Sequence, residues 1–211
     1  MAKGGSGLGG GGNLQGKEGS VTNVSNIQDM ISERASFVTE ADEVLKVSRK
    51  MNDLFGAEGQ ITQFQTAKMS GALAYYDSNG NIAMNQKYMN LEGMNRAYDA
   101  AVKSGFHPGR GDKTGIQAVA AHEFGHALSD KAAAKLGAAD LEGASRTIVE
   151  RARAKTTHKT NMDFAKKISG YATYNFAECV AEAMSDWYCN GSKARKESRA
   201  IAAVVNNILK K

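Results

Sequence analysis

The feature that most constrains this chain is the motif His122-Glu123-x-x-His126, which lies in an alanine-rich, apolar run between residues 118 and 130. This composition favours a helix. Residues four apart share one face of a helix, so both imidazoles can reach the same metal ion. Glu123 lies about 100° further round, where its carboxylate can hold a water that the metal activates. Gly125 costs a helix about 1 kcal/mol relative to alanine, which indicates close packing or function.

A catalytic zinc site uses three protein ligands and leaves one position for water, so the motif needs a third ligand. The long metzincin motif requires a histidine at position 132, which is alanine here, and that class is excluded. Several acidic or histidine side chains remain as candidates: Asp130, His158, Asp163, Glu178 and Glu182.

Glu178 is the favoured third ligand, because it opens a predicted helix that is otherwise mostly apolar. Glu182 follows one turn later on the same face, where a second carboxylate can orient a ligating histidine. A competing interpretation makes Asn175 and Glu178 a helix cap, and the two roles are compatible. We expect Asp130 to pair with a lysine instead, and His158 to lie in an exposed Thr/Lys-rich link.

Residues 169–183 carry a resemblance to a known family. They read Ser-Gly-Tyr171-Ala-Thr-Tyr-Asn-Phe-Ala-Glu178-Cys-Val-Ala-Glu182-Ala, and they follow His-Glu-Phe-Gly-His. This combination resembles the gluzincin metallopeptidases, in particular the lethal-factor-like branch and related domains of phage and mobile-element proteins. The family pattern has a tyrosine seven residues before the glutamate ligand and Ala-Glu-Ala just after it. The resemblance covers about residues 72–188 and does not include residues 1–59.

The resemblance implies a zinc-dependent metallopeptidase that hydrolyses peptide bonds. Glu123 would be the general base, which takes a proton from the attacking water and passes it to the leaving amine. Tyr171 would donate a hydrogen bond to the developing oxyanion, with Tyr174 as a nearby alternative. Glu182 would lie behind the ligands and orient them. Three side chains would bind Zn²⁺: His122, His126 and Glu178.

For the fold, the sequence predicts an α+β, zincin-like domain, mostly helical with a small mixed β-sheet. Residues 1–25 are glycine-rich, with nine glycines among the first nineteen residues, and are expected to form a flexible arm that can attach to an assembly partner. The metallopeptidase domain would span residues 26–211. It would contain N-terminal helices (26–59), a catalytic core (60–190) and a C-terminal helix (191–211).

Within the core, Asn79-Gly80 between two alternating runs predicts a β-hairpin over residues 72–88, after a strand near 61–66. The polarity of the second hairpin strand predicts an edge strand. His107 belongs to a glycine-rich loop (105–112), where a merely exposed side chain is favoured over one that contacts substrate. Apolar periodicity predicts further helices at 91–104, 114–136, 141–155, 162–168, 175–189 and 192–210.

The net charge of +5 is uneven, because 13 Lys/Arg face 6 Asp/Glu from Arg146 onward. No nucleic-acid motif accompanies these charges, so solvated helix faces are favoured over a nucleic-acid partner. No apolar run is long enough to span a membrane, and a secretory signal is not expected. Cys179 and Cys189 lie ten apart on one predicted helix, too far for a disulfide. A cytoplasmic protein, or one packaged in or attached to a phage particle, is expected.

The sequence therefore predicts a zinc metalloendopeptidase that acts on a protein or peptide substrate. One alternative is a structural or binding protein, such as a phage protein, that retains the zinc-binding fold without proteolysis. The glycine-rich arm and the basic C-terminal third suit attachment to a partner. The other alternative is a metal-free helical protein in which the motif is accidental.

Overall fold

The computed structural model describes residues 38–210. The glycine-rich arm (1–25) and the first part of the predicted N-terminal helices (26–37) lie outside the described residues. The elements, in chain order, are α2 (Val38–Phe55), β1 (Gln63–Ala67), β2 (Ala74–Asp77), β3 (Asn81–Asn85), η2 (Gln86–Tyr88), α3 (Leu91–Lys103), α4 (Gly115–Leu136), α5 (Leu141–Arg153), α6 (Asn161–Ala165), η3 (Tyr171–Thr173), α7 (Phe176–Asn190), η4 (Gly191–Lys193) and α8 (Lys196–Leu209). The predicted α+β class is confirmed, since most of these elements are helices and the strands form one small mixed sheet.

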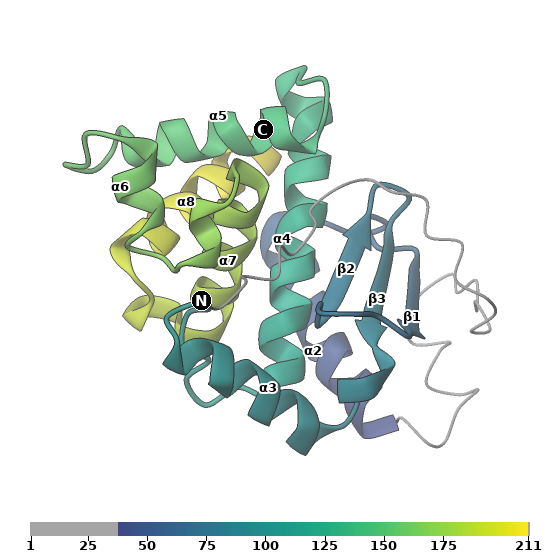
Figure 1. The fold of residues 1–211 in the computed structure, drawn as a ribbon. Coiled ribbons are helices and arrows are strands. Elements are labelled where there is room, and N and C mark those ends of the chain that lie inside the picture. Colours follow the sequence, from purple (N-terminus) through teal and green to yellow (C-terminus); the bar gives the residue numbers. More distant parts are fainter. Residues whose placement is uncertain (1–37, 211) are drawn as a thin grey trace.

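Helix α4 crosses the middle of the molecule, with the sheet on one side and α5, α7 and α8 on the other (Figure 1). Thr114 and Gln117 form a capping box at its start, and Gly137 ends it in the left-handed conformation, with φ of 62°. Nearly every residue from 115 to 129 is buried. A helix whose side chains are small and mostly apolar on every face is stable only when other elements cover it on all sides. This explains the central place of α4.

The three strands have the order β1-β3-β2, with β1 parallel and β2 antiparallel to β3. The predicted hairpin is confirmed: β2 and β3 flank a turn in which Gly80 has φ of 83°. The predicted edge position of the second hairpin strand is wrong, because β3 is the central strand. Its polar Asn85 is buried and donates to the backbone oxygens of Met69 (3.2 Å) and Ala72 (2.7 Å). A polar residue that is satisfied in this way does not require an edge.

The predicted helices correspond to α3 to α8, with shifts of a few residues at their ends. Helix α6 already ends at Ala165, and residues 191–193 form η4 ahead of α8. Cys179 and Cys189 are free and buried, as their spacing predicts. Within residues 38–210, no helix has the length and apolarity that a membrane crossing requires.

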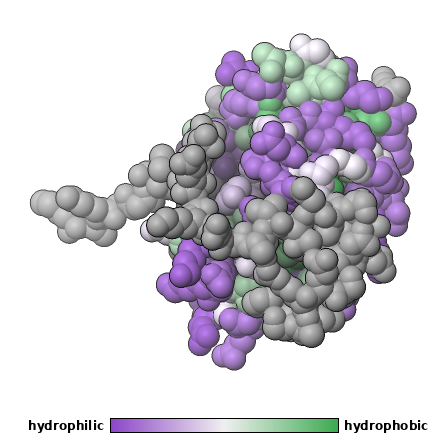
Figure 2. Space-filling model, turned by 90° about the vertical axis from the view of Figure 1, so that its right-hand side faces the viewer, coloured by the Kyte–Doolittle hydropathy of each residue, from purple (hydrophilic) through white to green (hydrophobic). Residues whose placement is uncertain are grey.

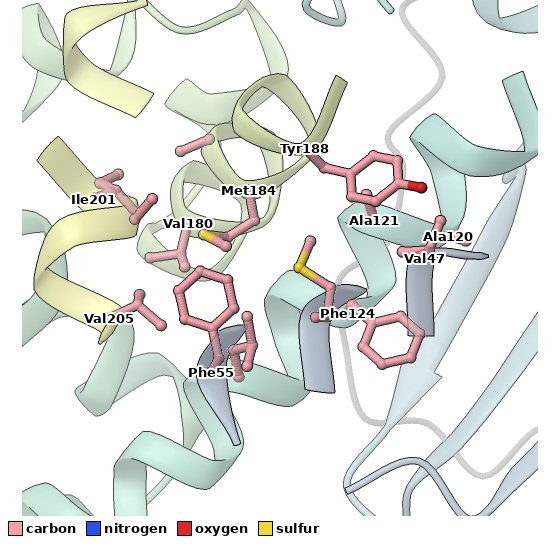
Figure 3. Close-up of a cluster of buried hydrophobic side chains, with 14 of the residues drawn as sticks. Val47, Phe55, Ala120, Ala121, Phe124, Val180, Met184, Tyr188, Ile201 and Val205 are labelled. Atoms are coloured by element: carbon pink, nitrogen blue, oxygen red, sulfur yellow. The ribbon is translucent and has the colours of Figure 1, made fainter. Parts of the chain in front are cut away.

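The core lies where α2, α4, α7 and α8 meet, and Figure 3 shows part of it. Among the side chains drawn there are Phe55 of α2, Phe124 of α4, Val180 of α7 and Val205 of α8. On the side nearer the sheet, the described residues visible in Figure 2 are mainly hydrophilic. The sheet also contributes buried apolar side chains to this core, namely Phe64 of β1 and Ile82 and Met84 of β3.

Helices α4 and α7 pack closely against each other at Gly125. A Cβ atom at this position would lie 2.6 Å from the Cα of Ala181, a backbone atom that cannot move aside locally. Real Cβ atoms essentially never approach that closely, so the two helices require a residue without a side chain here. This explains why the helix retains a glycine despite its low helix propensity.

We predict that Gly125→Ala lowers the free energy of unfolding by about 1–3 kcal/mol through overpacking, although alanine favours a helix. Gly143→Ala is the matched control on α5, where the new Cβ would lie 3.3 Å from a side-chain oxygen of Asp140 and meet no backbone atom outside its own helix within 4 Å. That control should be neutral or slightly stabilising. Urea unfolding of both variants measures the difference, and equal behaviour would contradict the packing argument.

Candidate metal centre

Three predicted ligands come together from two helices. His122 and His126 lie on α4, Glu178 lies in the first turn of α7, and one ligand atom of each is within 4.8 Å of the others. The Oε2 atom of Glu178 is 3.1 Å from Nε2 of His122 and 3.6 Å from Nε2 of His126. The three side chains are only 8–13% exposed. The geometry thus brings together the residues that spacing and resemblance selected.

The position of Glu178 depends on how α7 begins. Asn175 caps the helix, since its Oδ1 accepts the backbone N–H of Glu178 at 2.7 Å. The carboxylate of Glu142, on α5, accepts the N–H groups of Phe176 (3.2 Å) and Ala177 (2.9 Å). The predicted N-cap at Asn175 is therefore confirmed. It coexists with a side chain of Glu178 that faces the histidines.

The donor set fits a zinc ion. In a tetrahedral site with bonds of about 2.0–2.1 Å, neighbouring ligand atoms lie about 3.3–3.4 Å apart, close to the two distances at Glu178. The Oε2 atom of Glu178 is buried, and within the described residues it accepts no hydrogen bond. A buried carboxylate oxygen without a donor is costly, and a cation between it and the two imidazoles would satisfy it.

The charge of Glu178 agrees with this arrangement. Burial by itself would raise its pKa, but the facing rings of His122 and His126 hold the pKa well below its ordinary value. The carboxylate is therefore ionised at neutral pH, as a metal ligand must be.

Glu182 lies behind His122 and is almost fully buried. Its Oε1 accepts Nδ1–H of His122 at 2.8 Å and of His107 at 2.9 Å, and its Oε2 accepts the hydroxyl of Ser169 at 2.7 Å. Burial raises the pKa of Glu182, but hydrogen bonds from the two histidines outweigh burial and lower it to about 2. With its Nδ1–H committed to this carboxylate, His122 would offer Nε2, which lies 3.1 Å from Oε2 of Glu178, to a bound metal ion.

Glu123 and Tyr171, the predicted catalytic residues, also lie at this centre. Glu123 is 5% exposed, and burial raises its pKa above the ordinary value although His122 and His126 act in the opposite direction. The ring of Tyr171 is parallel to that of His122, with centroids 5.8 Å apart. Burial and the nearby carboxylate of Glu178 raise the pKa of Tyr171, so its hydroxyl keeps its proton.

Tyr174, the alternative to Tyr171, is 54% exposed. Its ring packs edge-on against Tyr171 and Phe106, with centroids 5.1 Å and 5.9 Å away. Tyr171 is the tyrosine that stacks on a candidate ligand, so the geometry favours it as the hydroxyl donor.

The remaining candidate ligands have other partners. Asp130 accepts a hydrogen bond from the hydroxyl of Tyr76 at 2.9 Å, so the predicted lysine partner is wrong. The carboxylate of Asp163 accepts a hydrogen bond from the hydroxyl of Thr160 at the start of α6, and its backbone N–H donates to the same hydroxyl. The Nε2 atom of His158 lies 2.6 Å from Oε1 of Glu197, and its side chain is 11% exposed. The predicted exposure of His158 is therefore wrong, and its partner is Glu197 and not the metal centre.

His107 was missed by sequence reasoning. It was expected to be exposed, but its side chain is 12% exposed and bonded to Glu182. No spacing rule links a loop residue to a helix 75 positions later. The one signal in the sequence was the small number of histidines. The chain has four, and three of them lie at this centre.

A scan against protein-family models, a search of curated proteins and a search of solved structures each found no match to this chain.

We predict that the full chain binds one Zn²⁺, and that His126→Ala and Glu178→Gln each weaken binding by more than about 100-fold, the upper range for residues that merely orient a ligand. Zinc at about 1,000 times its Kd should stabilise the wild type by about 4 kcal/mol. Chelator competition and thermal unfolding measure both effects. Asp130→Asn, one turn beyond His126 on α4, is the control and should bind zinc like the wild type.

Proposed function

We propose that this chain is a zinc-dependent metallopeptidase with a zincin-like fold of the gluzincin type. The observation that carries the proposal is the convergence of His122, His126 and Glu178 around Oε2 of Glu178, which accepts no hydrogen bond within the described residues. Two imidazoles and one carboxylate are the ligand set of catalytic zinc in several metallopeptidases, and they leave a fourth position for water. A purely structural zinc site is usually closed by four protein ligands.

The surroundings of the three ligands support hydrolysis rather than metal storage. When bound, zinc lowers the pKa of water and polarises a substrate carbonyl. Glu123 follows His122 directly on α4 and would accept the proton from the attacking water. Its raised pKa suits a group that must later return that proton to the leaving amine. The protonated hydroxyl of Tyr171 would donate to the oxyanion that forms on the carbonyl.

The buried groups around these residues would hold the catalytic side chains in position. Glu182 orients His122 through the 2.8 Å hydrogen bond to its Nδ1. A fixed ring orientation matters because misplacement of a catalytic group by about 1 Å can cost roughly 100-fold in rate. The proposed substrate is a protein or peptide, and the proposed site of reaction is the metal centre beside Glu123 and Tyr171.

We predict that Glu123→Gln keeps zinc affinity within a few-fold of the wild type but lowers peptide cleavage by about 10²- to 10⁴-fold, because it removes the proton acceptor alone. Cleavage of a pooled peptide library, read by mass spectrometry, provides the measurement, with zinc content determined on the same samples. If wild type and variant both hold zinc and neither cleaves, the result supports the alternative of a binding or structural protein. Full activity in the variant would exclude the mechanism.

Tyr171→Phe should lower kcat by about 10²- to 10³-fold, the range for loss of one oxyanion donor, with little change in zinc affinity. The phenyl ring keeps the packing against His122 and removes only the hydroxyl. Tyr174→Phe is the matched control, and its kcat should remain near that of the wild type. If the two variants lost activity in the opposite order, the assignment of the oxyanion donor would move to Tyr174.

A further inference from the structure

The loop at residues 105–108 is held against the metal centre by the segment that carries Tyr171. The backbone N–H of Gly170 donates to the carbonyl of Gly105 at 2.8 Å, and that of Tyr171 donates to the carbonyl of Phe106 at 3.0 Å. The rings of Phe106 and Tyr171 stack with centroids 4.8 Å apart. These contacts fix the loop beside Tyr171.

His107 projects from this loop into a position that its neighbours determine. Its ring lies parallel to that of Tyr98 on α3, with an interplanar angle of 2° and centroids 5.1 Å apart. Tyr98 is itself buried, and its hydroxyl donates to the carbonyl of Pro108 at 3.1 Å. The same tyrosine thus supports both the imidazole and the backbone that follows it.

The polar contact of His107 is with the carboxylate that orients His122. Both imidazoles place Nδ1 against the same oxygen, Oε1 of Glu182, at 2.9 Å for His107 and 2.8 Å for His122. Because a lone pair facing an ionised carboxylate would be repelled, each Nδ1 must carry its hydrogen. Ser169 donates to the other oxygen, so three donors from three segments hold this one carboxylate.

His107 does not belong to the ligand group itself. Its ring centroid lies 6.3 Å from that of His122, and the three ligand atoms are supplied by His122, His126 and Glu178. If His107 were absent, Oε1 of Glu182 would keep only His122 as a donor. The carboxylate would then be less constrained, and so would the ring that it orients.

We propose that His107 is a positioning residue of the metal centre, which holds the Glu182 oxygen that orients His122 and thereby strengthens zinc binding. The proposal rests on the proposed zinc site and assigns the loop a role in it. Residues that orient a metal ligand from behind typically change metal affinity by about 10- to 100-fold when removed. His107 acts one contact further out, through Glu182.

The test compares two variants of the full chain that have nearly the same shape. His107→Asn keeps an N–H donor close to the position of Nδ1, whereas His107→Leu replaces it with a methyl group. Each protein is prepared metal-free, its folding is checked by circular dichroism, and its Kd for zinc is measured by competition with a chromophoric chelator. We expect the leucine variant to bind zinc about 10-fold more weakly, at the lower end of the range for residues that contact a ligand directly, and the asparagine variant to recover most of the affinity.

A second readout is the visible spectrum of the Co²⁺-loaded protein, which reports the ligand geometry directly. It should change in His107→Leu and return toward the wild-type spectrum in His107→Asn. If His107→Leu does not fold, His107→Phe keeps a ring against Tyr98, lacks the donor, and is used in its place.

His158→Leu is the matched control, because it breaks another buried histidine–carboxylate pair, with Glu197, away from the centre. It should lower the thermal midpoint and leave zinc affinity within about two-fold of the wild type, far below the change expected at an orienting residue. If His107→Leu folds and binds zinc as tightly as the wild type, the role of His107 is wrong. The same holds if His158→Leu loses as much zinc affinity as His107→Leu. Either result would leave the proposed function standing. A wild type that binds no zinc would overturn the proposed function together with the role of His107.

Discussion

The close contact between α4 and α7 at Gly125 and Ala181 is the constraint on which the candidate site depends. A Cβ on Gly125 would reach to 2.6 Å from the Cα of Ala181, so the two backbones touch. His122 and His126 flank Gly125 on one helix, and Glu178 and Glu182 flank Ala181 at the same spacing on the other. Short-range contact of the backbones therefore brings two imidazoles and two carboxylates face to face.

Three carboxylates are buried around these histidines, and such charges are costly unless each is compensated. Glu182 receives three hydrogen bonds from protein groups. Glu178 faces two imidazoles but accepts no hydrogen bond at Oε2 within residues 38–210, and Glu123 has a raised pKa. The charge of Glu182, behind His122, is thus compensated by hydrogen bonds, whereas Oε2 of Glu178, which faces the two imidazoles, accepts none within residues 38–210. That asymmetry is what a site prepared for a cation and a reacting water requires.

The elements around α4 divide the work of building this centre. Helix α4 carries two of the candidate ligands and Glu123, and α7 carries Glu178 and Glu182. The short η3 turn supplies Tyr171, and the loop at 105–108 closes the rear of the site through His107. Because these segments are separated in the sequence, the site exists only when the helices are packed. The candidate site therefore forms only in the folded chain.

The sequence by itself determined the features that depend on local spacing. A four-residue step places His122 and His126 on one helix face, Asn175 caps the helix of Glu178, and Asn-Gly turns the hairpin. These features depend on residues close together in the sequence and on their backbone preferences, so a short stretch of sequence is enough to predict them.

Only the tertiary structure decided the contacts between distant segments. It placed β3 in the centre of the sheet, because β1 pairs with its free side and loop carbonyls satisfy Asn85. It paired His158 with Glu197 and brought His107 to Glu182 across 75 positions. Such pairs have no periodic signal, since they arise from the packing of whole elements. The motif specified a chemistry, and the packing decided which residues surround it.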